Sequence, residues 1–359
     1  MKLPGDLGHL TYCLNIHPAE TWPECSAALS GPVARVKEML SPEAPFTTGL
    51  RFSGVAVSDL EQPENRSELK AILAGNDLVP LTVNGFPYGP FHGTRVKQDV
   101  YQPDWRTEER VAYTIALADL MADLNPAGAE ISLSTVPGTF NPLGPGNEQL
   151  IADNYLRVAA HCHGLAERTG RIVQIAIEPE PFCFLETIAE TTAFFDQYLF
   201  SDAAVQSMAS VTGLGTSAAA DALHRHLGLC YDVCHAAVEY EDPQGSIDEL
   251  SAHGVPVHKL QLSAALHVPS VTPDARAALA RFDEPTYLHQ VVSRRGDALH
   301  FESDLPEALA RKDTDGEEWR IHFHVPLFVE EIPPFASTQP FLREILAIHK
   351  SRPISSHLE

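Results

Sequence analysis

The sequence predicts an α/β protein and, within that class, a single-domain (β/α)8 TIM barrel over residues 1–359. Three observations support this expectation. Short β-rich runs alternate with longer amphipathic stretches, which is typical of βαβ units and a parallel sheet. A chain of 359 residues, 44% of them hydrophobic, can bury the core of such a barrel. Polar residues suited to chemistry follow the predicted strands, where barrel active sites lie.

Seven strands are predicted before residue 264. They cover residues 10–16, 49–53, 78–85, 129–135, 172–178, 228–232 and 257–263. Helices are predicted between them, near residues 23–40, 64–75, 104–124, 147–169, 187–200, 216–227 and 244–253. In the third of these helices, an apolar stripe is spaced as in a helix that lies on a sheet. The stripe consists of Val111, Ile115, Ala118 and Ala122.

The regular spacing fails after the seventh strand. Residues 264–319 form a long polar excursion, which we expect to be an insertion within the domain. Segments of this length inside a compact domain usually carry a function. A β-like run at residues 319–328 and a helix at 338–349 follow. Residues 354–359 look like the opening of an eighth strand, which must pair with the first strand if the barrel is to close. Either this last strand is short, or the natural chain continues.

Composition limits the class of partner. A formal net charge of −23 does not suit nucleic acid, which attracts clustered Lys and Arg. No apolar run approaches the ~18 residues of a membrane span, and the first residues have no signal-peptide core. The six cysteines form no CxxC pair, so neither a disulfide framework nor a zinc ribbon is indicated. We therefore expect a cytoplasmic protein that binds a small-molecule metabolite.

Two carboxylates follow the fifth predicted strand. Glu178 and Glu180 alternate with Pro179 and Pro181, which places both acids on one face of an extended, stiff segment. A solvated strand end is the alternative, but an acid directly after IVQIAI is costly to leave unpaired. We take Glu178 and Glu180 as candidate acid–base residues and Glu178 also as a candidate metal ligand.

An Asp and a His lie at the junction after the sixth strand. Asp232 and His235 are three residues apart, a spacing that lets both side chains reach one cation. The alternative is structural, with Asp232 binding backbone amides at the start of the next helix. In the seventh strand, Gln261 is a candidate but weak ligand, and Lys259, on the same face, is a candidate substrate contact.

Two further imidazoles occur in the late β-like run. His322 and His324 are two residues apart, so in a strand they share one face. This spacing supplies either two metal-ligand nitrogens or one ligand and one substrate contact. His17, Asn84 and His92 lie after the first and third strands, in loops that mix amides with aromatic walls, and we take them as candidate substrate contacts.

Eight segments of the chain carry a family resemblance: LTYCLNIHPAETW, TVNGFPYGPFH, VKQDVYQPDW, ISLSTVPGTF, IAIEPEP, YDVCHAAVEYE, VHKLQLSAAL and IHFHVPLF. Together they resemble the xylose isomerase-like TIM-barrel superfamily and, within it, metabolite-traffic proteins described as sugar-phosphate isomerase/epimerase-like. The resemblance implies a divalent metal, with Mn, Zn and Mg all open, held by Glu178, Asp232, His235 and Gln261.

The same resemblance points to departures from the family pattern. Glu180 stands where sugar isomerases often carry Lys, which argues against ordinary ketol isomerisation. His322 and His324 match a His pair that related AP endonucleases add after strand seven. The strand-eight carboxylate of the superfamily has no secure counterpart, since Glu359 only neighbours that position.

Three functions follow from this pattern. The first is a metal-dependent isomerase or epimerase acting on a small polyol or phosphorylated metabolite in a metabolite-export pathway. A metal-dependent phosphoester hydrolase is the second. The third is a non-catalytic protein that binds a metabolite and hands it to other proteins of that pathway.

Overall fold

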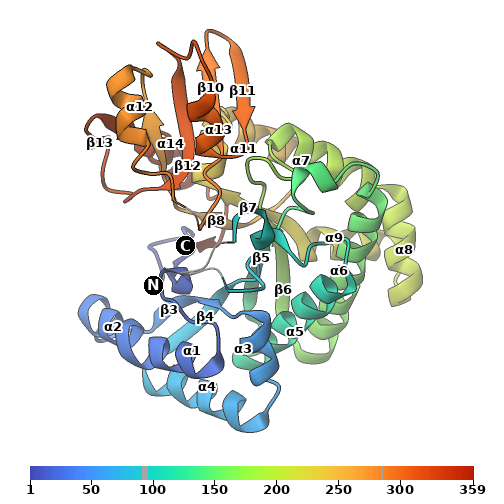
Figure 1. The fold of residues 1–359 in the computed structure, drawn as a ribbon. Coiled ribbons are helices and arrows are strands. Elements are labelled where there is room, and N and C mark those ends of the chain that lie inside the picture. The colour runs from blue at the N-terminus through green and yellow to red at the C-terminus, as the bar shows by residue number, and fades with distance from the viewer. Residues whose placement is uncertain (91–95, 285) are drawn as a thin grey trace.

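The computed structural model describes residues 1–90, 96–284 and 286–359. Its centre is a ring of parallel strands surrounded by helices (Figure 1). The strands of the ring are β1 (His9–Leu10), β2 (Tyr12–Cys13), β3 (Phe46–Arg51), β4 (Leu78–Asn84), β5 (Glu130–Thr135), β6 (Ile172–Ile177), β7 (Leu227–Asp232), β8 (Val257–Gln261) and β15 (His357–Leu358).

The last strand closes the ring. β15 pairs in parallel with β1 and also with β8, so it fills the gap between the first and seventh strands of the barrel. β1 and β2 together form one broken first strand, because Thr11 between them donates its N–H to the carbonyl of Leu358 at 2.7 Å. β2 then pairs with β3. The (β/α)8 expectation is confirmed, with an eighth strand of only two residues.

Helices occupy the segments where the sequence predicted them, and several short ones were not predicted, among them α3, α8 and α10. The helix predicted at residues 23–40 is interrupted by a π-helical turn, Leu29–Val33, and the one predicted at residues 187–200 ends in another, Phe195–Leu199. The helices are α1 (Trp22–Ala28), α2 (Ala34–Leu40), α3 (Gly54–Asp59), α4 (Pro63–Gly75), α5 (Glu108–Leu124), α6 (Glu148–Thr169), α7 (Ile188–Phe194), α8 (Asp202–Thr212), α9 (Thr216–His226), α10 (Val233–Val238), α11 (Pro243–Ala252), α12 (Pro273–Leu279), α13 (Leu305–Ala310) and α14 (Gln339–Ser351).

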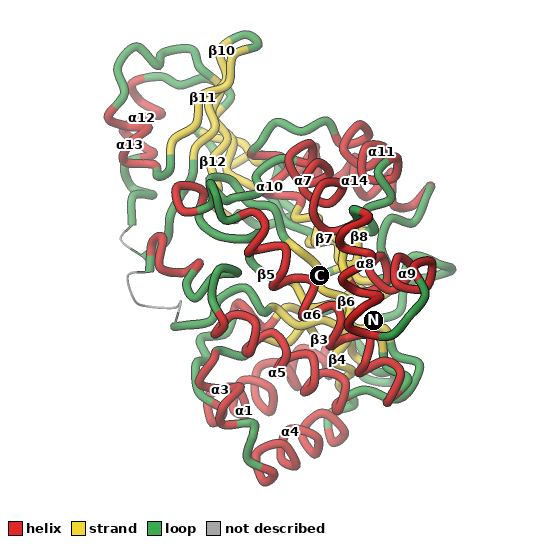
Figure 2. Tube along the Cα trace, turned by 90° about the vertical axis from the view of Figure 1, so that its right-hand side faces the viewer, coloured by secondary structure: helices red, strands yellow, loops and turns green. Residues whose placement is uncertain are grey.

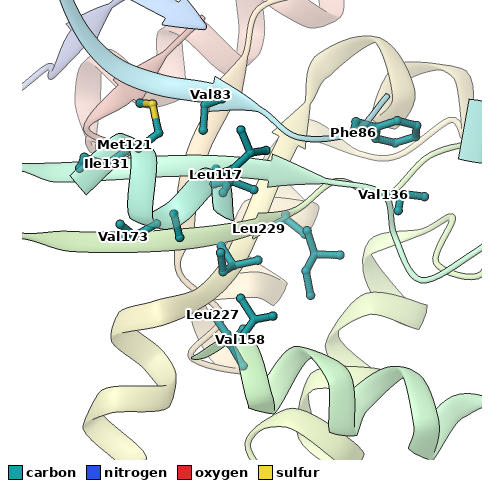
Figure 3. Packing of buried hydrophobic residues seen from close by; sticks show 14 of the residues in the cluster. Val83, Phe86, Leu117, Met121, Ile131, Val136, Val158, Val173, Leu227 and Leu229 are labelled. Carbon is teal, nitrogen blue, oxygen red and sulfur yellow. The ribbon is translucent and has the colours of Figure 1, made fainter. Parts of the chain in front are cut away.

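The main hydrophobic core lies between the strands and the surrounding helices. Figure 3 shows part of it, where Leu117 and Met121 of α5 pack beside Val83 and Ile131 of neighbouring strands. The predicted stripe on α5 is buried at Val111, Ala118 and Ala122 and partly buried at Ile115. This packing fixes the strand ends from which the polar residues project.

Residues after β8 form a second sheet instead of a polar excursion. Its six strands pair antiparallel in the order β11-β10-β12-β9-β14-β13, and Figure 2 shows β10, β11 and β12 standing out from the barrel. The sheet has its own apolar cluster, which includes Leu266, Trp319 and Ile321. Its strands are β9 (Ala265–Val268), β10 (Val291–Arg295), β11 (Ala298–Glu302), β12 (Glu318–His324), β13 (Glu331–Ile332) and β14 (Phe335–Ser337).

This inserted sheet begins and ends at one place. Ala265, at its start, accepts a hydrogen bond from the N–H of Thr338 at 3.0 Å. In return, the N–H of Ala265 donates to the Thr338 hydroxyl at 2.8 Å. The insertion is therefore longer than the predicted 264–319, because β12 and β14 belong to it.

All six cysteines are free thiols, as the lack of a CxxC pair predicted. Among the described residues, no helix is both long enough and apolar enough to cross a bilayer.

Candidate metal centre

A cavity of about 360 Å³ opens at the carboxyl ends of the barrel strands, between the barrel and the inserted sheet. Barrel residues form one side of it and residues 287–289 and 322–324 of the insertion form the other. Its lining includes Asn15, Asn84, Phe86, Pro87, Lys97, Val100, Tyr101, Glu178, Glu180, His235, Gln261, Tyr287, Leu288, His289, His322, Phe323 and His324.

Glu178 and Glu180 lie at the end of β6 and both line this cavity. They are 4% and 6% exposed. Burial, together with the nearby negative charge of Asp232, raises the pKa of Glu178 to about 7, and burial also raises the pKa of Glu180. The Glu178 carboxyl group is therefore suited to hold or release a proton near neutral pH.

The two acids differ in their partners. Glu180 Oε1 accepts a hydrogen bond from the Tyr101 hydroxyl at 2.8 Å and a longer one from the Gln290 amide at 3.4 Å. Glu178 Oε2 is buried and accepts no hydrogen bond from the described residues. An unpaired buried carboxylate oxygen is costly, so Glu178 is the acid whose environment is incomplete without a further group.

Asp232 has a structural role in addition to its position in the site. It is the N-cap of α10, and its Oδ1 accepts hydrogen bonds from the N–H groups of Cys234 and His235 and from the Ser263 hydroxyl. Its Oδ2 accepts from the Gln261 amide at 2.8 Å. Burial opposes ionisation of Asp232, but the neighbouring imidazoles and these donors lower its pKa overall. The structural alternative from the sequence, a helix cap, thus applies to Asp232, and its place beside the imidazoles leaves the role of metal ligand as a proposal.

Three imidazoles converge at the mouth of the site. His235 Nε2 lies 3.2 Å from His322 Nε2, which lies 3.2 Å from His324 Nε2. His235 comes from α10 and the other two come from β12, so the barrel and the inserted sheet both contribute. Burial and the neighbouring imidazoles hold the pKa of His322 well below its usual value. Burial acts in the same direction on His235, but the charges of Asp232, Glu180 and Glu178 raise its pKa overall.

The geometry fits a divalent metal. The ligand atoms of Glu180, His235 and His322 lie within 4.8 Å of one another, as do those of Asp232, His235 and His324. Two nitrogens on one tetrahedral zinc, each about 2.0 Å from it, are about 3.3 Å apart, close to the separations in this cluster. Gln261 Oε1, like Glu178 Oε2, is a buried acceptor without a partner among the described residues. A cation would satisfy the ligand atoms of either group, and the oxygens of Glu178 and Gln261 lie in the same cavity.

Most residues singled out from the sequence lie at the site. Glu178, Glu180, His235, Gln261, His322, His324 and Asn84 line the cavity, and Asp232 contacts Gln261 and His235 beside it. His17 does not line it, and its Nε2 lies 3.1 Å from the Tyr12 hydroxyl. His92 lies outside the described residues.

Lys259 differs from the expectation. Its side chain is fully buried, and its Nζ lies 3.2 Å from Glu359 Oε1 and donates to Ser134 at 3.3 Å. It does not line the cavity. Alternation along β8 correctly placed Lys259 on the same inward face as Gln261. Lys259 lies two residues before Gln261, however, so its side chain is deeper in the barrel interior and does not reach the cavity.

Tyr101 and Gln290 belong to the site and were not predicted. Both are buried, and the Gln290 amide donates to the Tyr101 hydroxyl at 2.9 Å. Tyr101 lies in a short 3₁₀ turn, Lys97–Tyr101, and Gln290 precedes β10 of the insertion. Neither follows a predicted barrel strand, so the strand-end criterion gave no signal for them.

Comparison with known proteins gave matches only among solved structures. No family model and no curated protein matches the chain. The IolI protein, described with a bound zinc atom, is 12% identical over 71% of this chain and 72% of its own, with a TM-score of 0.40. A xylose isomerase domain protein from Planctomyces limnophilus is 12% identical over 65% and 68%, with a TM-score of 0.41. The 3-keto-D-glucoside 4-epimerase YcjR from E. coli is 16% identical over 71% and 78%, with a TM-score of 0.39.

Proposed function

We propose that the protein is a metal-dependent isomerase or epimerase that acts on a small polyol-like or phosphorylated metabolite. The observation that carries the proposal is that two buried carboxylates and three converging imidazoles line one cavity at the carboxyl ends of the strands. A cation-binding cluster beside a carboxyl group with a raised pKa is the arrangement needed to move a proton next to a carbonyl or hydroxyl.

The ion would be held by His235 and His322 with Glu180, or by His235 and His324 with Asp232. Glu178 and Gln261 offer further oxygen atoms in the same cavity. A nitrogen-rich set favours a borderline ion such as Zn²⁺ over Mg²⁺, which prefers oxygen ligands. When bound, such an ion supplies Lewis acidity that polarises a substrate oxygen.

The proton transfer falls to the carboxyl groups. Tyr101 fixes Glu180 through a hydrogen bond of 2.8 Å, so this carboxyl group is held in one orientation at the cavity wall. Glu178 has an oxygen free of donors from the described residues and serves either as a metal ligand or as the base. The apolar side chains of Phe86, Val100 and Leu288 around the cavity limit the access of water to these groups.

The narrower resemblance is to the metabolite-traffic protein EboE. By this resemblance the substrate would be an intermediate of a metabolite-export pathway, other proteins of that pathway would be the partners, and the site of action would be the cytoplasm. A net charge of −23 would repel the phosphates of a nucleic acid, so we propose no nucleic-acid substrate.

Solvent-deuterium exchange tests the proposal. Metal-loaded protein is incubated in D₂O with a panel of polyols, sugars and their phosphates, and deuterium uptake at carbon is followed by mass spectrometry. We expect uptake into at least one compound and its loss in Glu180→Gln, with the metal content of the same samples measured so that lost catalysis is separated from lost metal. No uptake into any compound of the panel overturns the isomerase assignment.

A metal-dependent phosphoester hydrolase is the second candidate. It is favoured by the His322 and His324 pair, which adds two nitrogens to the barrel's own residues and suits a centre with more than one ion. Release of inorganic phosphate from the phosphorylated members of the same panel, without deuterium uptake, would support it.

A non-catalytic binding protein is the third candidate. The hydrogen bond from the Gln261 amide to Asp232 favours it, because this bond occupies a carboxylate oxygen that a metal would otherwise use. Gln261→Glu distinguishes the alternatives. If the bond blocks the centre, the variant gains metal affinity by removing the amide donor and adding a carboxylate, and unchanged metal affinity argues against blocking.

A further inference from the structure

Gln290 connects the inserted sheet to the carboxylate segment of the barrel. It is 1% exposed and lies just before β10. Its amide nitrogen donates to the carbonyl of Pro181 at 3.0 Å and to the Tyr101 hydroxyl at 2.9 Å. Its amide oxygen lies 2.8 Å from His322 Nδ1, and its backbone carbonyl accepts the N–H of His322 at 2.9 Å. His322 is therefore held by both the backbone and the side chain of Gln290.

The contact with Pro181 decides which end of the Gln290 amide faces His322. A carbonyl oxygen only accepts hydrogen bonds, so the Gln290 NH₂ group must face Pro181. The amide oxygen then faces His322 Nδ1, and since an amide oxygen only accepts, His322 Nδ1 must carry the hydrogen. In the neutral imidazole this leaves a lone pair on Nε2, the atom that faces His235 and His324.

The same reasoning applies to His235. Its Nδ1 lies 2.8 Å from the carbonyl of Pro179, so Nδ1 carries the hydrogen and Nε2 carries the lone pair. The two Nε2 atoms are 3.2 Å apart and, in the neutral rings, have no hydrogen to share. Two lone pairs at this separation repel each other unless a proton or a metal ion lies between them, and a metal ion would be shared by both nitrogens.

We propose that Gln290 is a positioning residue of the metal centre, holding His322 in the tautomer and ring orientation that present Nε2 to the ion. The inference rests on the proposed metal centre and extends it to the inserted sheet. Outer hydrogen-bond partners of metal-bound histidines fix the tautomer and raise ligand basicity, and their loss typically costs about 10–100-fold in metal affinity.

Three variants test this role, with Zn²⁺ affinity measured by chelator competition and the visible spectrum of the Co²⁺-loaded protein recorded for each. Gln290→Leu removes the acceptor for His322, and we expect Zn²⁺ affinity to fall about 10–100-fold and the Co²⁺ bands to shift. Gln290→Glu keeps an acceptor at His322 Nδ1 but loses the donor to Pro181, and we expect a smaller loss of affinity than in Gln290→Leu. Gln339→Leu is the matched control, because Gln339 is also buried and donates to a backbone carbonyl, that of Leu327, at 2.7 Å.

The outcomes separate positioning from packing. Thermal unfolding of each variant confirms that it is folded. Parent-like affinity in Gln290→Leu overturns the proposal, and so does an equal loss in Gln339→Leu, because that loss would follow from removing any buried amide of this kind rather than the acceptor at His322. His235→Ala tests the centre itself. If the parent protein binds no Zn²⁺, or His235→Ala binds it as the parent does, the metal centre fails and the role of Gln290 falls with it.

Discussion

Two carboxylates buried in the same barrel have opposite environments. Glu359 lies in the barrel interior, where its Oε1 is 3.2 Å from Lys259 Nζ and its Oε2 accepts a hydrogen bond from the Thr82 hydroxyl. Burial opposes its ionisation, but Lys259 and these donors lower its pKa overall. Glu178, at the strand ends, has an unpaired oxygen and a pKa raised to about 7 by burial and by Asp232. Burial is common to both, so what distinguishes Glu178 from Glu359 is that it has no cationic side chain like Lys259 in contact with it among the described residues.

The interior pair is built into the backbone around it. A side chain at Gly49 would clash with the Glu359 carboxylate, so glycine leaves the space that the pair occupies. Lys259 is fully buried, and its pKa is raised overall, since the attraction of Glu359 outweighs burial. We therefore interpret Lys259 and Glu359 as structural and the groups around Glu178 as functional.

Lys259→Met is expected to have the largest effect. It leaves Glu359 as an uncompensated buried charge, and breaking a buried pair in this way costs about 3–5 kcal/mol in the free energy of unfolding. Urea unfolding at pH 7 measures it. The double variant Lys259→Met/Glu359→Gln should recover a large part of the loss. If Lys259→Met unfolds like the parent protein, the two carboxylates do not differ in the way described.

Three histidines are buried near the amino ends of the barrel strands, at the opposite end from Glu178, and they allow the same comparison for bases instead of acids. Burial lowers the pKa of His226 to about 4, of His258 to about 3 and of His357 to about 4. Each has a ring nitrogen without a partner among the described residues.

For such a base the unfolded chain binds more protons than the folded one between the lowered pKa and 6.5, so stability falls as the pH falls through this window. His226 alone accounts for up to about 3 kcal/mol, at about 1.4 kcal/mol per pKa unit. Chemical unfolding between pH 7 and pH 4 measures the decline. His226→Gln should flatten the curve, and an unchanged curve would contradict a neutral His226.

Zn²⁺ is expected to stabilise the protein only by binding at the candidate metal centre, and not at the Lys259–Glu359 pair in the barrel interior. At 100 times its dissociation constant, a ligand that binds only the folded state adds about 2.7 kcal/mol to the free energy of unfolding. The gain should disappear in His235→Ala and persist in Glu359→Gln. Elemental analysis of the same samples checks that metal content follows stability. Equal metal content in His235→Ala and the parent protein would contradict the ligand set.

Glu178→Gln is expected to have the smallest effect on the free energy of unfolding and, unlike Lys259→Met, to increase it. Because the folded-state pKa of Glu178 is raised to about 7, the metal-free folded protein binds more protons than the unfolded chain above pH 4.5, and stability is lost as the pH rises toward 7. Removing the charge should therefore stabilise the metal-free protein by about 1–3 kcal/mol at pH 8 and have little effect at pH 4. Destabilisation at pH 8 would indicate a partner for Glu178.

His322 and His324 were singled out by their spacing, but it is β12 of the inserted sheet that brings them to the site. Strand positions and the convergence of Glu180, Asp232 and His235 followed from sequence, because both depend on local patterns. Buried parallel strands read as apolar runs, and polar residues at their ends meet at one edge of a barrel. The depth of Lys259 did not follow, because parity along a strand gives the face and not the height within the ring.

The inserted sheet was also not predicted. Its outer strand β11 is mostly exposed, so its sequence reads as a polar loop. Its pairing joins segments far apart in the chain, as where β9 lies beside β12 and β14. The contacts of Gln290 with Pro181 and Tyr101 cross between the sheet and the barrel, and no spacing within a single segment encodes them.

The paired hydrogen bonds between Ala265 and Thr338 give the insertion a property of its own. Because the points where the chain leaves and rejoins the barrel touch each other, the sheet is attached as if it replaced a tight turn. The sequence and length of such an inserted sheet can change without moving the barrel strands on either side of it. A barrel of this kind can acquire new donor atoms for its ligand by exchanging the inserted sheet, while the ring below keeps its register.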